Sequence, residues 1–363
     1  MAPVVKALRR RVEAFEVTVC ATGQHRAMLD QVEGLLELRP DFDLDVMQHD
    51  QGLNGVASAV LAAFDPVLSS SLPDWLLVQG DTTTAMAATL AAFHRGVPVG
   101  HVEAGLRTGD LSRPFPEEAN RRVVDLLSSA LFAPTKRSVE ALRLEGCPSE
   151  RIFLVGNPVV DALLEIAARL PPPQPRGVEV LVTMHRRESF GGPALAVFAA
   201  LRELATRFPD VRWIYPVHPN PRIQQPALAE LQGLANVELH PPFDYEALVQ
   251  RLRSCRFVLT DSGGLQEEAP SFGKPVLVMR EVTERPESVE AGVSRLVGTD
   301  RELIVEAATE LLTSPEAYAA MARAASPYGD GYAGERIAAI LAGENWEPLG
   351  AAEQANAPAA GRQ

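Results

Sequence analysis

The sequence is poor in several features that would assign it to a common class of protein. Its 3 cysteines, Cys20, Cys147 and Cys255, are isolated, so they predict neither a disulfide framework nor a CxxC metal site. With a net charge of −13, it lacks the basic excess of proteins that bind nucleic acid. No continuous apolar run approaches the roughly 18 residues that span a bilayer. Near the N-terminus the positive charges follow the apolar residues, the reverse of a secretory signal. These absences predict a cytoplasmic protein without nucleic-acid or membrane partners.

Familiar cofactor motifs are missing as well. The chain contains no G-x-G-x-x-G, no Walker loop and no spaced set of metal ligands, so we expect no dinucleotide cofactor, no ATP hydrolysis and no metal. What remains is a chain of 363 residues with an ordinary 46% of hydrophobic and 22% of charged residues. Such a length is long for one core and comfortable for two domains.

Short apolar runs alternate with segments of helical period throughout the chain, which is typical of βα units on parallel sheets. We therefore predict an α/β fold of two doubly wound, Rossmann-like domains whose active site lies in the cleft between them. The predicted domains are 1–169 and 178–342, with the proline-rich stretch 170–177 as linker, a last helix that can cross back to the first domain, and a disordered tail at 343–363. Six strands are expected in each domain, at 15–22, 42–46, 75–81, 97–104, 130–135 and 152–157, and at 178–185, 211–218, 236–242, 256–262, 274–279 and 294–298.

The start of the chain conflicts with this topology. It opens on a helix, "PVVKALRRR", although the first strand of a doubly wound sheet is central and precedes the first helix. A sheet without that strand would leave unpaired backbone groups in the core. We therefore expect the first strand of domain 1 to be missing from this sequence; the alternative is a rearranged sheet that starts on the helix.

Three carboxylates of the first domain are candidate catalytic groups. Asp81 follows the strand 75–81, and Glu103 ends the next strand, so the two are expected at the same sheet edge. Neighbouring carboxylates can raise each other's pKa and suit general acid and base catalysis. "PFPEEANRR" then begins a helix, where Glu117 is the better catalytic candidate and Glu118 is expected to complement the helix dipole. An ordinary N-cap role for Asp81 remains an alternative.

In the second domain, polar groups follow several predicted strands. His218, in "YPVHPNP", is placed to contact a phosphate or donate a proton. In "LTDSGGLQEEAP", Ser262, Gly263 and Gly264 open a helix in a manner typical of a phosphate-binding turn, and Glu268 could accept hydrogen bonds from ribose hydroxyls. "TMHRRESFGG" brings His185, Arg186 and Arg187 to another strand end, where they could bind phosphate or brace the domains.

Six segments of the sequence together resemble the non-hydrolysing UDP-N-acetylglucosamine 2-epimerases. The resemblance extends from residue 1 to about 342 and rests on "QGDTTT", "HVEAGLRTGD", "PFPEEANRR", "DSGGLQEEAP", "GKPVLVMR" and "TERPE". It implies the two-domain fold of B-type glycosyltransferases (GT-B) and interconversion of UDP-GlcNAc and UDP-ManNAc without NAD or an obligatory metal. It further implies catalytic roles for Asp81, Glu103, Glu117 and His218, and nucleotide contacts from Ser262, Gly263, Gly264, Glu268 and Arg285.

The resemblance also carries expectations beyond the reaction. It implies a homodimer, a supply of UDP-ManNAc for cell-surface polysaccharides, and an allosteric UDP-GlcNAc site lined by Gln24, His25 and Arg187, although Ala27 stands where a polar residue is common. The basic loop that precedes "MAPVVKAL" in the family is absent, in agreement with the missing strand. The alternatives are a B-type glycosyltransferase, a hydrolysing relative that releases ManNAc, and a catalytically impaired UDP-sugar-binding protein.

Overall fold

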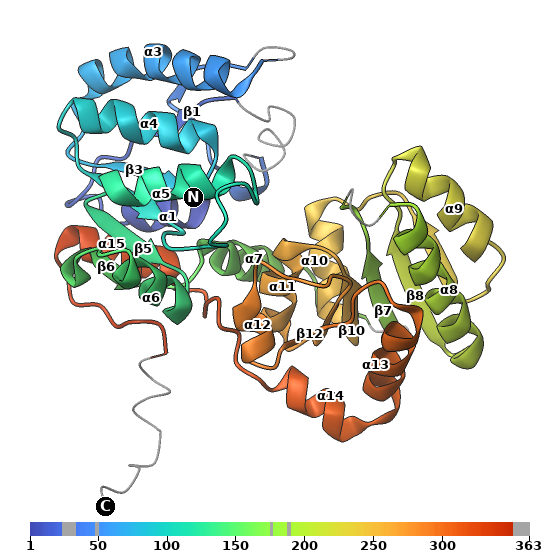
Figure 1. Cartoon of the computed structure of the whole chain (residues 1–363). Coiled ribbons are helices and arrows are strands. Elements are labelled where there is room, and N and C mark those ends of the chain that lie inside the picture. Colours follow the sequence, from blue (N-terminus) through green and yellow to red (C-terminus); the bar gives the residue numbers. More distant parts are fainter. Residues whose placement is uncertain (24–33, 48–50, 175–176, 187–189, 351–363) are drawn as a thin grey trace, which may run out of the picture. The chain divides into compact units, whose positions relative to one another are not determined.

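Helices and parallel strands alternate along the chain in a computed structural model that describes residues 1–23, 34–47, 51–174, 177–186 and 190–350 (Figure 1). The contacts divide the chain into two units. Unit 1 contains Met1–Ala162 and the segment from Tyr328 onward, and unit 2 contains Leu163–Pro327. The chain therefore leaves unit 1 within one helix, α7 (Pro158–Arg169), rather than at the proline-rich stretch 170–177.

Unit 2 is built on one parallel sheet with the order β12-β11-β10-β7-β8-β9. Its strands are β7 (Val178–Thr183), β8 (Val211–Pro216), β9 (Val237–His240), β10 (Phe257–Thr260), β11 (Val276–Val278) and β12 (Ser294–Leu296). Its helices after α7 are α8 (Gly192–Arg207), α9 (Pro221–Leu231), α10 (Tyr245–Ser254), α11 (Gly263–Glu268), η3 (Ala269–Phe272), α12 (Pro286–Glu290), α13 (Arg301–Thr313) and α14 (Pro315–Ala322).

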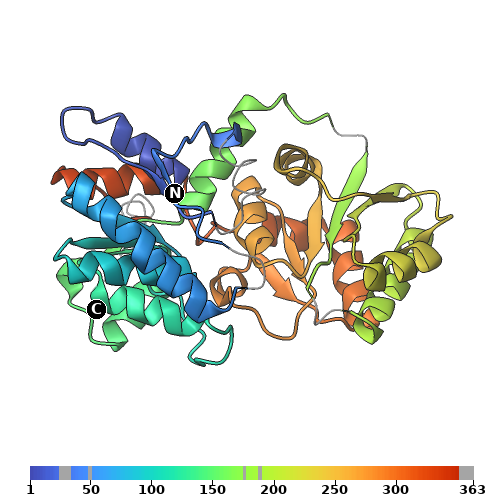
Figure 2. The same ribbon diagram turned by 90° about the horizontal axis from the view of Figure 1, so that it is seen from above.

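Alternating side chains of these strands bury both faces of the sheet. Val180 and Val182 pack with α8, α9 and α13 on one face, whereas Leu181, between them, packs with α10 and α11 on the other. Helices are accordingly seen on both sides of this sheet in Figure 2. This is the doubly wound arrangement that brings the loops after parallel strands to one edge, where ligands bind.

Unit 1 has its strands in two parallel sheets, β1-β2 and β3-β4-β5-β6. The strands are β1 (Cys20–Ala21), β2 (Phe42–Asp43), β3 (Leu76–Gln79), β4 (Val99–Val102), β5 (Ala130–Ala133) and β6 (Ile152–Leu154). The helices are α1 (Ala2–Arg9), α3 (Leu53–Ser71), α4 (Thr83–His94), α5 (Glu117–Leu127), α6 (Lys136–Leu144), η1 (Ser149–Arg151) and α15 (Ala333–Ala342). On one face, α1 and α15 share a core with β4 and β5, and α15 lies against α1.

All the predicted strands appear, each shorter than predicted. The predicted α/β class and parallel sheets are confirmed, with a break between β2 and β3 in the described part of unit 1. The predicted tail is wrong in its first part: Trp346 packs edge-on against Phe153 at a ring distance of 5.8 Å, and the Leu349 N–H donates to the Leu154 carbonyl at 3.1 Å. An aromatic contact and a strand-end hydrogen bond therefore order these residues.

Helix α3 is long and apolar, although the sequence has no continuous apolar run long enough to span a bilayer. Its 19 residues have a mean hydropathy of 1.3, so by length and composition alone it could cross a bilayer. However, Asp65 and Pro66 interrupt its apolar sequence, and its buried side chains pack in the core shared with α4. The high hydropathy of α3 is therefore explained by its packing against the β3–β4 region, while its other side stays exposed.

Candidate active site

The ends of β3 and β4 bring two predicted carboxylates to one edge of the unit 1 sheet. Gln79 pairs with Val102 in the parallel register, so Asp81 and Glu103 follow adjacent strand ends. A methyl group on Gly80 would lie 3.6 Å from Oε2 of Glu103, which places the Glu103 carboxylate beside the residue that precedes Asp81. Thr82, not Asp81, caps helix α4, because its side chain accepts a hydrogen bond from the Ala85 N–H. The side chain of Asp81 is therefore not used for capping.

The side chain of Glu103 is fixed from two sides. Its Oε2 accepts a hydrogen bond from the Gln79 amide at 3.2 Å, and its Oε1 accepts one from the Asn157 amide at 3.2 Å. The Glu103 backbone has φ of 72°, a left-handed conformation that costs a non-glycine residue about 1 to 3 kcal/mol. Strain of this kind at a polar, hydrogen-bonded residue is typical of a functional site.

The two glutamates at the start of α5 have different surroundings. Oε2 of Glu117 is buried and accepts no hydrogen bond within the part of the chain that the structure describes. Glu118 is fully buried, and its carboxylate accepts hydrogen bonds from the Thr108 and Gly109 N–H groups at 3.0 and 3.2 Å. Glu118 thus anchors the acidic loop to α5 rather than only complementing the helix dipole, and Glu117 keeps an oxygen available for chemistry.

The arginines of this segment have separate roles that the sequence could not assign. Arg121 forms ion pairs with both Asp81 and Glu118, so it links the end of β3 to the anchored loop. The Asn120 amide adds a hydrogen bond to the Asp81 carbonyl at 3.0 Å. Because one guanidinium and one amide from α5 hold Asp81, the position of this carboxylate depends on α5 as much as on β3.

A buried network behind the carboxylates was not predicted. Nδ1 of His101, on β4, is hydrogen-bonded to Asp125 at 2.5 Å, and its Nε2 to the Gly80 carbonyl at 2.9 Å. Asp125 also accepts from Arg107 at 2.7 Å and from the Gly105 N–H at 3.2 Å. The network therefore ties Gly80, next to Asp81, to Gly105, two residues after Glu103.

Electrostatics determine the charge of this network. Burial alone would raise the pKa of Asp125, but the adjacent His101 and Arg107 outweigh it and hold that pKa below its ordinary value. Asp125 is therefore a carboxylate at neutral pH. The side chains of His101 and Asp125 are 0% and 2% exposed, so the charge of the Asp125 carboxylate is balanced within the protein rather than by solvent.

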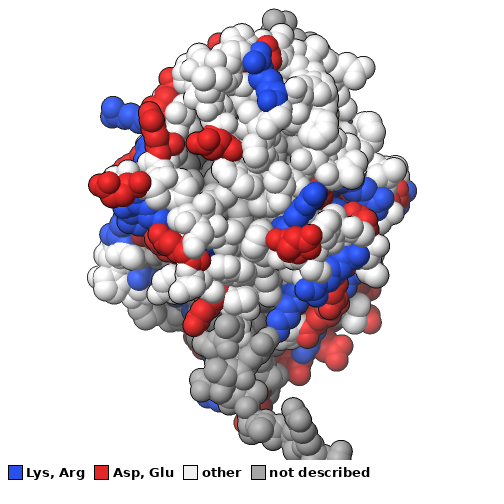
Figure 3. All heavy atoms as spheres, turned by 90° about the vertical axis from the view of Figure 1, so that its left-hand side faces the viewer, with Lys and Arg blue, Asp and Glu red and all other residues white. Residues whose placement is uncertain are grey.

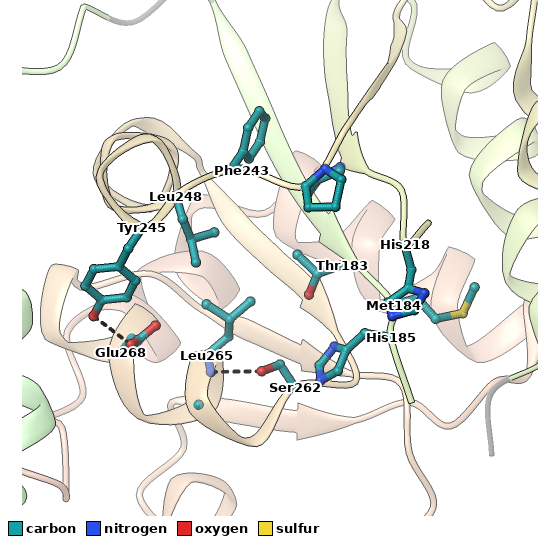
Figure 4. A pocket seen from close by; sticks show the side chains of 13 residues that line it. Thr183, Met184, His185, His218, Phe243, Tyr245, Leu248, Ser262, Leu265 and Glu268 are labelled. Atoms are coloured by element: carbon teal, nitrogen blue, oxygen red, sulfur yellow. Dashed lines mark hydrogen bonds between the residues drawn. The ribbon is translucent and has the colours of Figure 1, made fainter. Parts of the chain in front are cut away.

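Unit 2 contains a pocket of about 360 Å³ at the carboxyl ends of its central strands. Figure 4 shows His185 and His218 at one end, Tyr245 and Glu268 at the other, and Leu248 and Leu265 between them. Its lining residues come from the ends of β7, β8 and β10, the loop before α10, and α10 and α11: Thr183, Met184, His185, Pro216, His218, Pro242, Phe243, Tyr245, Leu248, Ser262, Gly264, Leu265 and Glu268.

Both histidines at one end of the pocket are oriented by hydrogen bonds. His185 lies 3.0 Å from the fully buried Asp261 carboxylate, which also accepts from the His185 and Arg186 N–H groups. In His218, Nδ1 accepts from the Asn220 N–H at 3.1 Å, so the hydrogen of the neutral ring lies on Nε2. The predicted His218 thus has a second imidazole beside it, that of His185, which the sequence placed at the end of a neighbouring strand.

The phosphate-binding turn predicted at 262–264 is held by hydroxyl groups. The Ser262 N–H donates to Oγ1 of Thr260 at 2.9 Å, and Oγ of Ser262 accepts from the Leu265 N–H at 3.4 Å. Thr183 and Thr260 are hydrogen-bonded through their hydroxyls at 2.6 Å, which ties β7 to β10 beneath the turn. The turn is therefore a preformed part of the pocket floor.

Glu268 is the predicted site residue with the largest electrostatic perturbation. It is buried, and burial raises its pKa to about 7, with Glu267 adding to the rise and a hydrogen bond from Tyr245 opposing it. The Tyr245 hydroxyl donates to Oε1 of Glu268 at 2.8 Å. A carboxyl with this pKa changes charge near neutral pH, so its ligand contacts depend on pH.

The remaining predicted residues lie elsewhere. Arg285 forms an ion pair with Glu267 and is not one of the pocket-lining residues. Gly263 lies beside the Arg186–Glu284 ion pair, because a methyl group on its Cα would be 3.6 Å from Nη2 of Arg186. Gln24, His25 and Arg187 are outside the described residues. Among the described residues, no group of three or more His, Cys, Asp or Glu side chains could hold a metal ion.

Comparison with known proteins places the chain among nucleotide-sugar enzymes. The family model described as UDP-N-acetylglucosamine 2-epimerase matches residues 6–342. The chain is 49% identical over 355 residues to the UDP-N-acetylglucosamine 2-epimerase of Yersinia pestis, covering 94% of each chain. Its fold matches the crystal structure of UDP-GlcNAc 2-epimerase from Neisseria meningitidis bound to UDP-GlcNAc, with a TM-score of 0.83, 42% identity, and coverage of 94% of this chain and 95% of that chain.

The fold also resembles that of a glycosyltransferase. The match to SnogD from Streptomyces nogalater has a TM-score of 0.60 at 17% identity and covers 94% of each chain. At that identity the likeness concerns the fold alone. It is consistent with the predicted two-domain architecture of B-type glycosyltransferases.

Proposed function

The chain belongs to the UDP-N-acetylglucosamine 2-epimerase family, and we propose that it interconverts UDP-GlcNAc and UDP-ManNAc by inverting carbon 2 of the sugar. The observation that carries this proposal is the register of β3 and β4, which brings Asp81 and Glu103 to one sheet edge. Glu117, with its unpartnered buried oxygen, is the third carboxylate of the set. In this proposal unit 2 binds UDP, and the carboxylates of unit 1 act on the sugar.

The proposed reaction proceeds by elimination and re-addition. The hydrogen on carbon 2 is weakly acidic, so the bond between carbon 1 and UDP breaks first, and UDP leaves with the bonding electrons. A carboxylate then takes the proton from carbon 2, and 2-acetamidoglucal forms with a double bond between carbons 1 and 2. A second acid protonates carbon 2 from the opposite face, and UDP adds back to carbon 1. Two faces require an acid and a base on opposite sides, which is the physical reason for several carboxylates.

The order of groups along the unit 2 pocket suits a nucleoside diphosphate. Phe243 and Leu248 offer an apolar wall for a base, and Glu268 offers a carboxylate for ribose hydroxyls. His185, His218 and the turn at Ser262 supply donors at the opposite end for phosphate. We propose that Gly263 and Gly264 let the backbone approach the diphosphate, and that Arg285 acts indirectly, through Glu267, on this site.

The reaction is tested by incubating the protein with UDP-GlcNAc in deuterated water. The expected product is UDP-ManNAc with deuterium at carbon 2, detected by mass spectrometry and proton NMR. Binding of UDP-GlcNAc without exchange at carbon 2 would indicate an impaired UDP-sugar-binding protein. Free ManNAc with UDP would indicate a hydrolysing enzyme, and sugar transfer to an added acceptor a glycosyltransferase. The three carboxylates favour the epimerase, because a transferase has no need for them together.

We also propose that the protein is a homodimer. Helices α3, α4 and α5 expose apolar side chains, including Phe93, Val123 and Leu126, which are 53%, 37% and 75% exposed. Figure 3 shows a broad area of unit 1 with few charged side chains at the height of α3 and α4 in Figure 1. Unpaired apolar surface of this kind supports a protein–protein interface.

Leu126→Glu is expected to convert the dimer to a monomer, because it places a charge in the proposed apolar interface. The measurement is molar mass by size-exclusion chromatography with light scattering. Leu144→Glu is the matched control, since Leu144 is 88% exposed on α6 and is expected to leave the molar mass unchanged. A dimeric Leu126→Glu protein would place the interface elsewhere.

Three finer proposals rest on the family resemblance. A second, regulatory UDP-GlcNAc site would involve Gln24, His25 and Arg187. Hyperbolic dependence of the rate on UDP-GlcNAc, together with full turnover of UDP-ManNAc before any UDP-GlcNAc is added, would argue against it. We further propose a cytoplasmic location and a supply of UDP-ManNAc for cell-surface polysaccharide. Loss of polysaccharide in a deletion strain, restored by this chain, is the test of that role.

A further inference from the structure

The start of α10 supplies two different groups to the unit 2 pocket. Asp244 caps this helix by accepting from the Ala247 N–H at 2.8 Å, which fixes the residues on either side of the cap. Phe243 precedes the cap and contributes an aromatic ring, and Tyr245 follows it and contributes a hydroxyl. The helix start is therefore a rigid frame from which both side chains reach the pocket.

The hydroxyl of Tyr245 is directed at a single partner. It donates to Oε1 of Glu268 at 2.8 Å, and no other described residue forms a hydrogen bond with that carboxylate. The second carboxylate oxygen of Glu268 thus has no donor among the described residues, although Glu268 lines the pocket. Burial and the neighbouring Glu268 raise the pKa of Tyr245 far above its ordinary value, so its hydroxyl remains a donor at any physiological pH. Figure 4 shows this pair at one end of the pocket.

We propose that Tyr245 is a specificity-determining positioning residue, which holds Glu268 so that its free oxygen accepts a hydrogen bond from a ribose hydroxyl and selects ribonucleotides over deoxyribonucleotides. The inference rests on the proposed function, since it assigns the ribose end of the UDP site. The hydrogen bond from Tyr245 orients the carboxyl group of Glu268, so a nucleotide that lacks the hydroxyl leaves the other buried oxygen without a partner or leaves Glu268 protonated. That penalty, more than the hydrogen bond itself, produces the discrimination.

The first test compares the binding of UDP, 2′-deoxy-UDP and 3′-deoxy-UDP by calorimetry. Wild-type protein is expected to prefer UDP over at least one deoxy analogue by about tenfold or more. Tyr245→Phe is expected to lose most of that preference, and Glu268→Leu, which offers no acceptor, all of it. In turnover, Tyr245→Phe should raise KM with kcat little changed, because the ribose is remote from carbon 2. Tyr332→Phe is the matched control, since Tyr332 is exposed on unit 1.

The pH dependence provides a second readout. The titratable groups around Glu268 are Tyr245 on α10, Glu267 on its own helix, and His185 and His218 across the pocket. The carboxylate form binds ribose, so UDP affinity should rise by about tenfold between pH 6 and pH 8 as Glu268 ionises around its pKa of about 7. Removing the Tyr245 hydroxyl removes a contact that lowers this pKa, so the rise should move to higher pH. The pH dependence of UDP affinity in Glu268→Gln measures the contribution of the phosphates and histidines, which is subtracted from that of the wild type.

Each outcome decides the inference. Unchanged discrimination in Tyr245→Phe would overturn the positioning role. If Tyr245→Phe fails to fold, Glu268→Asp serves instead, because it keeps the carboxylate but withdraws it from Tyr245. Unchanged discrimination in Glu268→Asp would also overturn the positioning role of Tyr245. Discrimination that survives in Glu268→Leu would place the ribose elsewhere while leaving the epimerase intact. Wild-type protein that binds no UDP would contradict the proposed function itself.

Discussion

Glu117→Gln is expected to abolish most deuterium incorporation at carbon 2, with a loss of kcat of about 10² to 10⁴-fold. The physical reason is that glutamine cannot take or return a proton, while its size is that of glutamate. The assay is the exchange reaction in deuterated water, with the initial rate followed by mass spectrometry. Asp81→Asn and Glu103→Gln are expected to lower the rate through the same loss of proton transfer.

Stability separates a catalytic role of Glu117 from a structural one. Its Oε2 is buried without a hydrogen-bond partner in the described structure, so removing the charge should leave the free energy of unfolding unchanged or raise it. Glu140→Gln, at an exposed position on α6, is the control for loss of one glutamate. A Glu117→Gln protein that exchanges deuterium at the wild-type rate would remove Glu117 from the mechanism.

Asp125→Asn is expected to destabilise unit 1 by about 3 to 5 kcal/mol, because it leaves the buried Arg107 and His101 without their common counter-charge. Glu145→Gln is the control, since Glu145 is the more exposed partner of Arg107, and we expect about 1 kcal/mol or less there. Trp213 lies in unit 2, so a Trp213→Phe background lets fluorescence report on Trp75 and Trp346 in unit 1. Urea unfolding in that background measures the effect.

The sign of the pH effect follows from the depressed pKa of Asp125. Its contribution to stability is complete above the ordinary carboxyl range, near pH 4, and is lost as pH falls through the folded pKa. The difference in stability between wild type and Asp125→Asn should therefore shrink in acid. A difference that is small at pH 7, or that grows in acid, would mean that Asp125 is not the charged centre of this network.

Local patterns predicted most of the fold because a short apolar run between polar turns favours a strand, buried in β5 and β10 but exposed in β2. They overestimated strand length: 15–22 contributes only Cys20–Ala21 to β1, since pairing with β2 limits the ladder. The domain boundary was less accessible to local reasoning. The prolines at 170–177 indicate a linker, but the compact units divide inside α7, where the boundary is decided by packing between residues far apart in the chain.

The candidate site also has residues that could be predicted from the sequence and residues that could not. Asp81 and Glu103 were predictable, because residues that end neighbouring parallel strands meet at one edge. Asp125 and Tyr245 were not, since each acts through a partner more than 20 residues away, His101 and Glu268 respectively. Arg285 differs again: the resemblance implies a nucleotide contact, and the structure adds an ion pair with Glu267 that the sequence did not indicate. Sequence spacing indicates which groups share an edge, but not which charge a neighbour neutralises.

The division of the chain into units has a consequence for synthesis. Unit 2 is one continuous stretch, Leu163–Pro327, whereas unit 1 needs both α1 and α15 for its core. A ribosome at about 5 to 20 residues per second makes α15 roughly 15 to 70 s after α1. The second unit can thus complete its core before the first. During that interval Val4, Ala7 and Leu8 of the nascent chain have no α15 to cover them, so this part of the core is completed only at the end of synthesis.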